Sequence, residues 1–306
     1  MTLVLQLAIA GLATGSVYAL IAIGIVLIYK CSGVVNFAQG AYAMVGAYVS
    51  YVLLQNTGLP AVAAVIGSMV VMACLGALTE RLVLRPMLKA PLVAVMMVTL
   101  GLLIFVRAAC LLVWGPDQIA FPPVFPEGAI NAGGIFITYN YVAAGLLAAV
   151  LSLGFLAFYR FTPMGLMQRC AADNSRAALA IGIHVSNQVS AAWAMSAALA
   201  GLAGTLLATL NGLSLGLSDI GMLAFPVIVV GGLSSLEGAL VAGLLLGMLQ
   251  SFTDGLLTPA LEDFLRANTS IYSVGALQQV VPYGLLVLML LLRPQGLFGR
   301  RGTERV

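Results

Sequence analysis

Two amide side chains, Asn36 and Gln39, are the first residues in this sequence that could do chemistry. They stand at the start of an apolar run, three residues apart, which would place both on one face of a helix. Amides donate and accept hydrogen bonds, and buried ones need partners. The pair therefore predicts one of two roles. It lines or gates a polar pathway, or it forms interhelical hydrogen bonds that hold the chain after a break at Gly33.

A second polar group follows a glycine pair at 231–232, where Ser234, Ser235 and Glu237 interrupt the apolar stretch 219–252. This interruption predicts two short helices joined by a turn. Serine at a helix start and glutamate in the first turn fit helix capping. The same three residues also suit a gate, so both roles stay open.

Two short capped helices are predicted beyond the middle of the chain. Thr162, with Pro163 at the next position, predicts one helix start. Asp173 or Asn174 predicts a second start, and Gly182 predicts its end. Two helices set at a fixed angle form an elbow that a partner protein could grip. A plain connecting loop is the alternative.

Several catalytic and metal-binding patterns do not occur in the sequence. There is no Gly-x-x-x-x-Gly-Lys-Ser/Thr motif for nucleotide phosphates. His184 is the single histidine, and the four cysteines are far apart without Cys-x-x-Cys spacing. No Ser-His-Asp set is apparent. ATP binding through that motif is excluded, and a metal site or an enzymatic activity is not expected.

The elements that carry these residues must be membrane helices. Of 306 residues, 62% are apolar and only 8% are charged, whereas soluble domains average roughly 25% charged residues. So few charges cannot cover the surface of a water-soluble globule. The 34 glycines suit closely packed transmembrane helices. The composition predicts an all-α polytopic membrane bundle and excludes a soluble enzyme, a nucleic-acid binder and a disordered protein.

The apolar runs predict about eight spans, since a membrane helix needs about 20 apolar residues. One of them is the broken stretch 219–252, which is expected as a steeply packed or re-entrant pair of short helices. Small residues at Gly11 and Gly15, and at Gly243 and Gly247, are expected to form helix-packing faces. The other spans are predicted at 3–29, 36–54, 60–79, 92–113, 140–159, 189–211 and 278–292.

The distribution of positive charge predicts the orientation, because cytoplasmic loops are enriched in Lys and Arg. An external N-terminus and a cytoplasmic C-terminus leave only Arg107 and Arg266 off the cytoplasmic side, out of thirteen basic residues. The remaining basic residues would all be cytoplasmic: Lys30, Arg81, Arg85, Lys89, Arg160, Arg169, Arg176, Arg293, Arg300, Arg301 and Arg305.

Two segments then form external caps, at 114–139 and 253–277. The first is rich in proline and glycine and is expected to be irregular with turns. The second is expected to hold a short interfacial helix that begins at Thr258 and Pro259.

The acidic residues favour transport driven by another chain. None of the ten acids falls at the centre of a predicted span, where ion-coupled carriers commonly place carboxylates. Arg107 is the one charge well inside a span, near its outer end, where a long side chain can snorkel. The alternative is a stand-alone channel or an ion-coupled secondary transporter for a small polar solute.

The elbow segment, 160–188, resembles the cytoplasmic coupling motif of the branched-chain amino-acid ABC transporter permeases. Stretches at 15–20, 35–40, 231–239 and 292–299 also resemble this family, so the resemblance covers nearly the whole chain. Gln39 stands where the family pattern has histidine, and glutamine cannot titrate near neutral pH. The motif positions in the elbow are Thr162, Gly165, Arg169, Asp173, Ala180, Gly182 and Ile183.

The resemblance implies a single permease domain over 1–306, without a cofactor, in a bacterial inner membrane. It implies a second homologous permease or a homodimer, two ATPase subunits on the cytoplasmic face and an external solute-binding protein. The cargo would be branched-chain amino acids or related small solutes. Glycines in the elbow would allow close backbone contact with the ATPase, and arginines would pair with its acids. The implied coupling residues are Thr162, Gly165, Arg169, Asp173, Asn174, Arg176 and Gly182.

Overall fold

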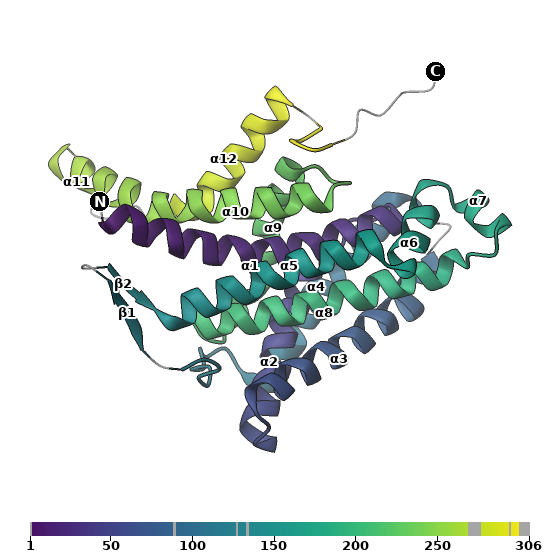
Figure 1. Ribbon diagram of the computed structural model, residues 1–306, viewed down its shortest axis with the longest axis horizontal. Coiled ribbons are helices and arrows are strands. Elements are labelled where there is room, and N and C mark those ends of the chain that lie inside the picture. Colours follow the sequence, from purple (N-terminus) through teal and green to yellow (C-terminus); the bar gives the residue numbers. More distant parts are fainter. Residues whose placement is uncertain are drawn as a thin grey trace.

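A computed structural model describes residues 2–87, 90–126, 128–132, 135–268, 277–293 and 295–299. Helix α1 (Thr2–Ser32) runs through the middle of the bundle, and α5 (Tyr139–Phe161), α8 (Val185–Asn211) and α10 (Leu236–Phe252) lie alongside it (Figure 1). This is the all-α polytopic bundle that the composition predicts.

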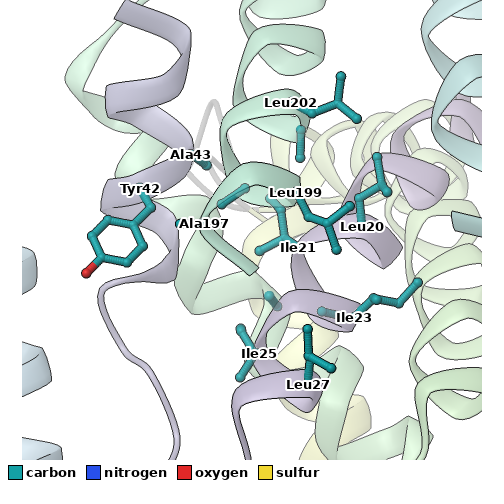
Figure 2. Close-up of a cluster of buried hydrophobic side chains, with 14 of the residues drawn as sticks. Leu20, Ile21, Ile23, Ile25, Leu27, Tyr42, Ala43, Ala197, Leu199 and Leu202 are labelled. Atoms are coloured by element: carbon teal, nitrogen blue, oxygen red, sulfur yellow. The ribbon is translucent and has the colours of Figure 1, made fainter. Parts of the chain in front are cut away.

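The core is formed where α1 meets α8. Branched side chains of α1, including Ile21 and Ile25, are fully buried, as is Ala197 of α8. Figure 2 shows these residues in one cluster with Leu199 and Leu202. A helix that is apolar all round must be buried in protein or in lipid, and these two helices are buried in protein.

The outer helices keep most of their apolar surface exposed. They are α3 (Ala61–Thr79) and α4 (Leu92–Trp114), whereas α2 (Gln39–Thr57) is mostly buried and adds Tyr42 and Ala43 to the core. Helix α3 continues through a π-turn (Glu80–Leu84) and a 3-10 turn (Arg85–Met87). In the most apolar stretches of α3, α4 and α5, only about a fifth of the residues is buried. This is expected for helices whose outer faces meet lipid.

Among the described residues, six helices are long and apolar enough to cross a membrane. They are α1, α3 with its extension, α4, α5, α8 and the run that begins with α10. Helix α2 is not among them because its 19 residues are more polar. Two further apolar helices, at Leu215–Gly231 and Gln279–Leu292, are shorter.

The predicted break in 219–252 is confirmed, and it turns the chain back on itself. A 3-10 turn (Leu215–Asp219) leads into α9 (Ile220–Gly231), which packs against α10. The joining turn is closed by a hydrogen bond from the Ser235 amide to the Gly232 carbonyl, at 2.9 Å. A Cβ atom at Gly231 would lie 2.4 Å from the Gly238 carbonyl oxygen, so glycine is required where the two helices meet.

A short helix begins at Thr258, as predicted, but the predicted N-cap role of Thr258 is wrong. Helix α11 (Thr258–Asn268) continues directly from α10 through a π-turn (Thr253–Leu257). The Thr258 hydroxyl donates to the Thr253 carbonyl at 3.0 Å instead of capping a helix. A π-turn absorbs the amide that Pro259 lacks, so the proline does not stop the helix.

The predicted packing faces of small residues are confirmed between α1 and α10. A Cβ atom at Gly15 would lie 2.7 Å from the Gly243 carbonyl oxygen. One at Gly247 would lie 2.3 Å from the Gly15 Cα. The two backbones therefore touch, which explains why glycines occupy both faces.

The cap at 114–139 contains structure that the sequence analysis does not predict. Strands β1 (Ala129–Ala132) and β2 (Ile135–Thr138) pair antiparallel, with Ala129 opposite Thr138. Ile119 forms a β-bridge with Leu213, just after α8. Gly133 and Gly134, in the glycine-rich part of the predicted irregular cap, lie outside the described residues.

The remaining elements lie toward the C-terminal half of the chain. The elbow consists of α6 (Pro163–Asp173) and α7 (Ser175–Ala180), and α12 (Leu277–Leu292) packs on α9. The C-terminal segment, residues 295–299, is hydrogen-bonded to the end of α9. The Leu297 amide donates to the Val230 carbonyl at 2.8 Å, and the Phe298 amide donates to the Gly231 carbonyl at 3.1 Å.

The elements sort to two ends of the bundle (Figure 1). The start of α1, α11 and the β-hairpin lie at one end, and the elbow lies at the other. The elbow end carries Lys30, Arg160, Arg169 and Arg176 around a shared cavity. Of the basic residues assigned to the cytoplasm, Lys89, Arg300, Arg301 and Arg305 lie outside the described residues.

Candidate functional site

The two amides of the N-terminal half are buried together in one hydrogen-bonded network with Ser196 of α8. The Asn36 Nδ2 donates to the Gln39 Oε1 at 3.1 Å. The Gln39 Nε2 donates to the Ser196 carbonyl, and the Ser196 hydroxyl donates to the Gln39 Oε1, both at 3.1 Å. Asn36 and Gln39 are fully buried. These are the interhelical hydrogen bonds that the second predicted role requires, in which the amides hold the chain after the break at Gly33.

Asn36 does not lie on α2, as the predicted span 36–54 requires. It lies in the break that follows Gly33, whose φ of +71° suits glycine. Its Oδ1 accepts from the Ala38 amide at 3.0 Å, just before the helix starts at Gln39. The asparagine therefore fastens the broken backbone to the first residue of α2.

The network lies within the depth of the bundle. A Cβ atom at Gly24 of α1 would lie 2.4 Å from the Gln39 Nε2. Gly24 is two turns before the end of α1 at Ser32, or about 12 Å along the helix. The segment 33–38 therefore runs back into the bundle before α2 begins. Irregular backbone at such depth is tolerated only where protein or a wet cavity surrounds it.

A cavity of about 920 Å³ lies at the elbow end of the bundle. Its walls come from the ends of α1 and α5, from the elbow, and from the turn before α10. Four basic residues line it, against two acidic ones, so an acidic partner surface would be attracted. The cavity joins candidate coupling residues to candidate gate residues: Arg169, Asp173, Asn174, Arg176, Ser234, Ser235 and Glu237.

The predicted caps of the elbow are confirmed. The Gly165 amide donates to the Thr162 hydroxyl at 3.2 Å. The Asn174 Oδ1 accepts from the amides of Arg176 and Ala177, at 3.1 and 3.0 Å. Asn174, and not Asp173, therefore starts α7.

The predicted end of α7 at Gly182 is also confirmed. Gly182 has a φ of +86°, and its amide donates to the Leu179 carbonyl at 3.1 Å. The Ile183 amide donates to the Ala178 carbonyl at 2.9 Å. These two bonds form a Schellman motif, which fixes where the chain leaves the elbow.

Two residues of the elbow hold it to α5. A Cβ atom at Gly165 would lie 2.1 Å from the Tyr159 carbonyl oxygen. The Arg169 guanidinium donates to the Arg160 carbonyl at 2.9 Å, at the last turn of α5. In contrast, Asp173 and Arg176 are exposed. The close approach expected of Gly165 is therefore made within the chain, while Arg176 is free to face a partner.

Three polar residues lie around the α9–α10 turn, of which one caps α10 and two are exposed. The Ser235 hydroxyl accepts from the Gly238 amide at 2.9 Å and caps α10. Glu237 is exposed in the first turn of α10, where its charge favours the helix dipole. Ser234 is exposed beside them.

Two ion pairs involve residues that the sequence analysis does not place in a site. Glu80 is 2% exposed and pairs with Arg85 at 3.2 Å, and the Ser190 hydroxyl of α8 donates to the Glu80 carboxylate. Arg107 of α4 pairs with Asp219 at 2.7 Å. In the first group Glu80 and Arg85 are close in sequence, but Ser190 is 110 positions from Glu80. The second pair joins residues 112 positions apart. Within the described residues, no group of three or more potential metal ligands gathers.

Comparison with known proteins shows to which family the chain belongs. Residues 7–290 match the family described as the permease component of a branched-chain amino acid transport system. The chain belongs to this family. It is a permease subunit, which is a transport component rather than an enzyme, and it is a multi-pass membrane protein.

Individual relatives extend over nearly the full length of the permease. It is 30% identical to the high-affinity branched-chain amino acid transport system permease protein BraD of Pseudomonas aeruginosa, over 99% of this chain and 98% of the relative. It is 30% identical to LivH of Escherichia coli K12, over 99% and 97%. It is 29% identical to a probable LivH of Methanocaldococcus jannaschii, over 92% and 88%. No solved structure gives a significant match.

Proposed function

We propose that this permease works in an ATP-driven importer of branched-chain amino acids or related small solutes. A second permease chain, homologous or identical, completes the pathway. Two ATPase subunits bind the cytoplasmic face, and an external binding protein delivers the solute. The observation that carries the proposal is the rigid elbow, which stands at one end of the bundle beside a cavity with an excess of basic residues.

The elbow is suited to transmit motion because both of its helices are fixed. Caps define the start of each helix, and Arg169 ties α6 to α5. The exposed Asp173 and Arg176 supply contacts for an ATPase, although an exposed ion pair contributes only about 0–1 kcal/mol. The fit of the elbow into a cleft should therefore matter more than any single charge.

The proposed topology places the elbow in the cytoplasm of a bacterial cell and the N-terminus outside the inner membrane. Four basic residues around the cavity support this orientation under the positive-inside rule. About eight spans follow if α2 and α12 cross and α9–α10 counts as a broken pair. The external caps would receive the binding protein.

The gate is proposed at the two breaks in the helices. Asn36 and Gln39 would lock the break before α2, since the Gln39 amide bonds across to Ser196 of α8 and the Asn36 amide bonds to Gln39. Ser234, Ser235 and Glu237 share the cavity with the elbow, so movement of the elbow would reach the turn before α10 directly. Transport would then require that the buried network rearrange.

The deciding experiment is uptake in vesicles that contain the complete importer. Leucine uptake should need internal ATP, the ATPase subunits and the external binding protein together. A variant of the ATPase that cannot hydrolyse ATP serves as the control. Uptake by this chain alone, indifferent to ATP, would show a stand-alone channel or an ion-coupled carrier instead.

A further inference from the structure

An exposed ion pair lies on the flank of the bundle, between α4 and the start of α9. The Arg107 Nη1 is 2.7 Å from the Asp219 Oδ1, and the two side chains are 42% and 63% exposed. Asp219 occupies the cap position of α9, yet its side chain makes no capping hydrogen bond there. Its carboxylate is turned toward Arg107 instead.

Both residues lie within the depth of the membrane helices. Helix α4 has 23 residues, so it is about 35 Å long, and Arg107 is only about 6 Å from its midpoint. Helix α9 has 12 residues, so Asp219 is about 18 Å from the turn at the elbow end. Arg107 could snorkel toward the outer end of α4, but its guanidinium is paired with Asp219 instead. Charges paired at such depth almost always face a protein interior or a water-filled cavity.

The surroundings of the pair are apolar. Ile104 and Leu111 lie on the Arg107 face of α4, three and four residues away, and are 65% and 43% exposed. Met222, three residues after Asp219, is 40% exposed. One positive and one negative group are thus set in an open apolar surface.

We infer that Arg107 and Asp219 form a transient binding site for an apolar amino acid on the translocation pathway. The guanidinium takes the carboxylate of the zwitterion, and the Asp219 carboxylate takes its ammonium group. The apolar side chain lies on Ile104, Leu111 and Met222. The net charge of the site and the zwitterion together stays zero, because the Arg107–Asp219 ion pair is replaced by one ion pair at each end of the amino acid. This inference rests on the proposed function and names residues that would touch its substrate.

The rival explanation is a tether between α4 and α9 that never meets the substrate. A double reversal separates the two, since Arg107→Asp with Asp219→Arg rebuilds a tether but inverts the charges seen by the amino acid. The single variants Arg107→Gln and Asp219→Asn remove one charge each. Arg266→Gln is the matched control, because Arg266 belongs to another exposed pair, with Glu262 at 3.4 Å.

The test uses vesicles with the complete importer, internal ATP, the loaded binding protein and labelled L-leucine. We expect both single variants and the double reversal to lower uptake at least tenfold. Complex yield and the ATPase rate stimulated by the binding protein should stay within twofold of wild type. The Arg266→Gln control should transport normally.

Three other outcomes would each contradict the inference, and they can be told apart. If both single variants transport within twofold of wild type, the inference is wrong and the proposed function stands. If the double reversal restores uptake lost in the single variants, or if yield falls as far as uptake, the pair is a tether. If the wild type takes up no leucine, isoleucine or valine with ATP, the branched-chain cargo of the proposed function is wrong and this inference falls with it.

Discussion

Gln39 is held by more partners than any other residue of the candidate gate. Its amide meets Asn36, the Ser196 hydroxyl and the Ser196 carbonyl in a fully buried position. A family histidine at this position could change charge near neutral pH, whereas glutamine cannot. The glutamine therefore serves the network only through hydrogen bonds, and its removal leaves buried polar groups without partners.

The first prediction concerns this network. We expect Gln39→Leu to lower the free energy of unfolding by about 1–3 kcal/mol, because Asn36 and Ser196 lose buried partners. Gln55→Leu, an exposed amide on the same helix, should change it by less than about 0.5 kcal/mol. Thermal unfolding of the purified permease measures both. Equal effects would show that the network adds no stability.

The second prediction concerns the cap of α7. Asn174→Ala removes a cap worth about 0.5–2 kcal/mol from a helix of only six residues, so α7 should fray and ATPase co-purification should fall several-fold. Asn187→Ala is the matched control, because Asn187 is an exposed asparagine at the start of α8 whose side chain caps no helix. If the two variants retain the ATPase equally, a formed α7 is not needed for docking.

At the scale of the elements, features that depend on neighbouring residues could be predicted from the sequence, whereas features set by tertiary packing could not. The caps at Thr162 and Asn174 and the stop at Gly182 could be predicted because each depends on neighbouring residues. The N-cap at Thr258 was mispredicted, since a π-turn leads directly into α11 and the Thr258 hydroxyl bonds to the Thr253 carbonyl. The β-hairpin in the cap left too short a pattern to find. The cavity could not be predicted either, because it joins residues 169–176 to residues 234–237 through tertiary packing.

The third prediction tests the contact between α1 and α10. Gly247→Ala places a Cβ atom 2.3 Å from the Gly15 Cα, and such overpacking should cost about 1–3 kcal/mol. Gly154→Ala on α5 has no atom within 4 Å of its new Cβ, so it should be neutral or stabilise by up to about 1 kcal/mol. Thermal unfolding should therefore move in opposite directions. A shift of the same sign and size in both would contradict the close contact.

For the whole molecule, the separation of charge between the two ends decides how the bundle sits in a membrane. The span order was predictable from apolar runs alone, and seven of the expected runs coincide with helices. The hydrogen bond from Ser190 to Glu80 and the ion pair between Arg107 and Asp219 were not predictable, because the two partners of each come from distant parts of the chain. The contacts between separate helices are thus the part of the molecule that the sequence pattern does not reveal.

The fourth prediction tests the orientation. A membrane-impermeant maleimide added to intact cells should not label Cys170 of α6, and labelling should appear after permeabilisation. The other cysteines, Cys31, Cys74 and Cys110, are first replaced by alanine. Asp117→Cys, in the exposed part of the external cap, is the positive control. Labelling of Cys170 from outside, with Asp117→Cys protected, would invert the proposed topology.

The bonds between residues 295–299 and the end of α9 have a consequence for biosynthesis. The Val230 carbonyl cannot accept its hydrogen bond until Leu297 has been translated, roughly 70 residues later. Translation of this segment takes on the order of 3–14 s at the usual rates. Until then the tip of the α9–α10 hairpin is unsealed while both of its helices are already inserted. Newly made chains therefore pass through a stage in which this tip is open to chaperones and proteases, and a nascent chain stalled before residue 295 stays at that stage.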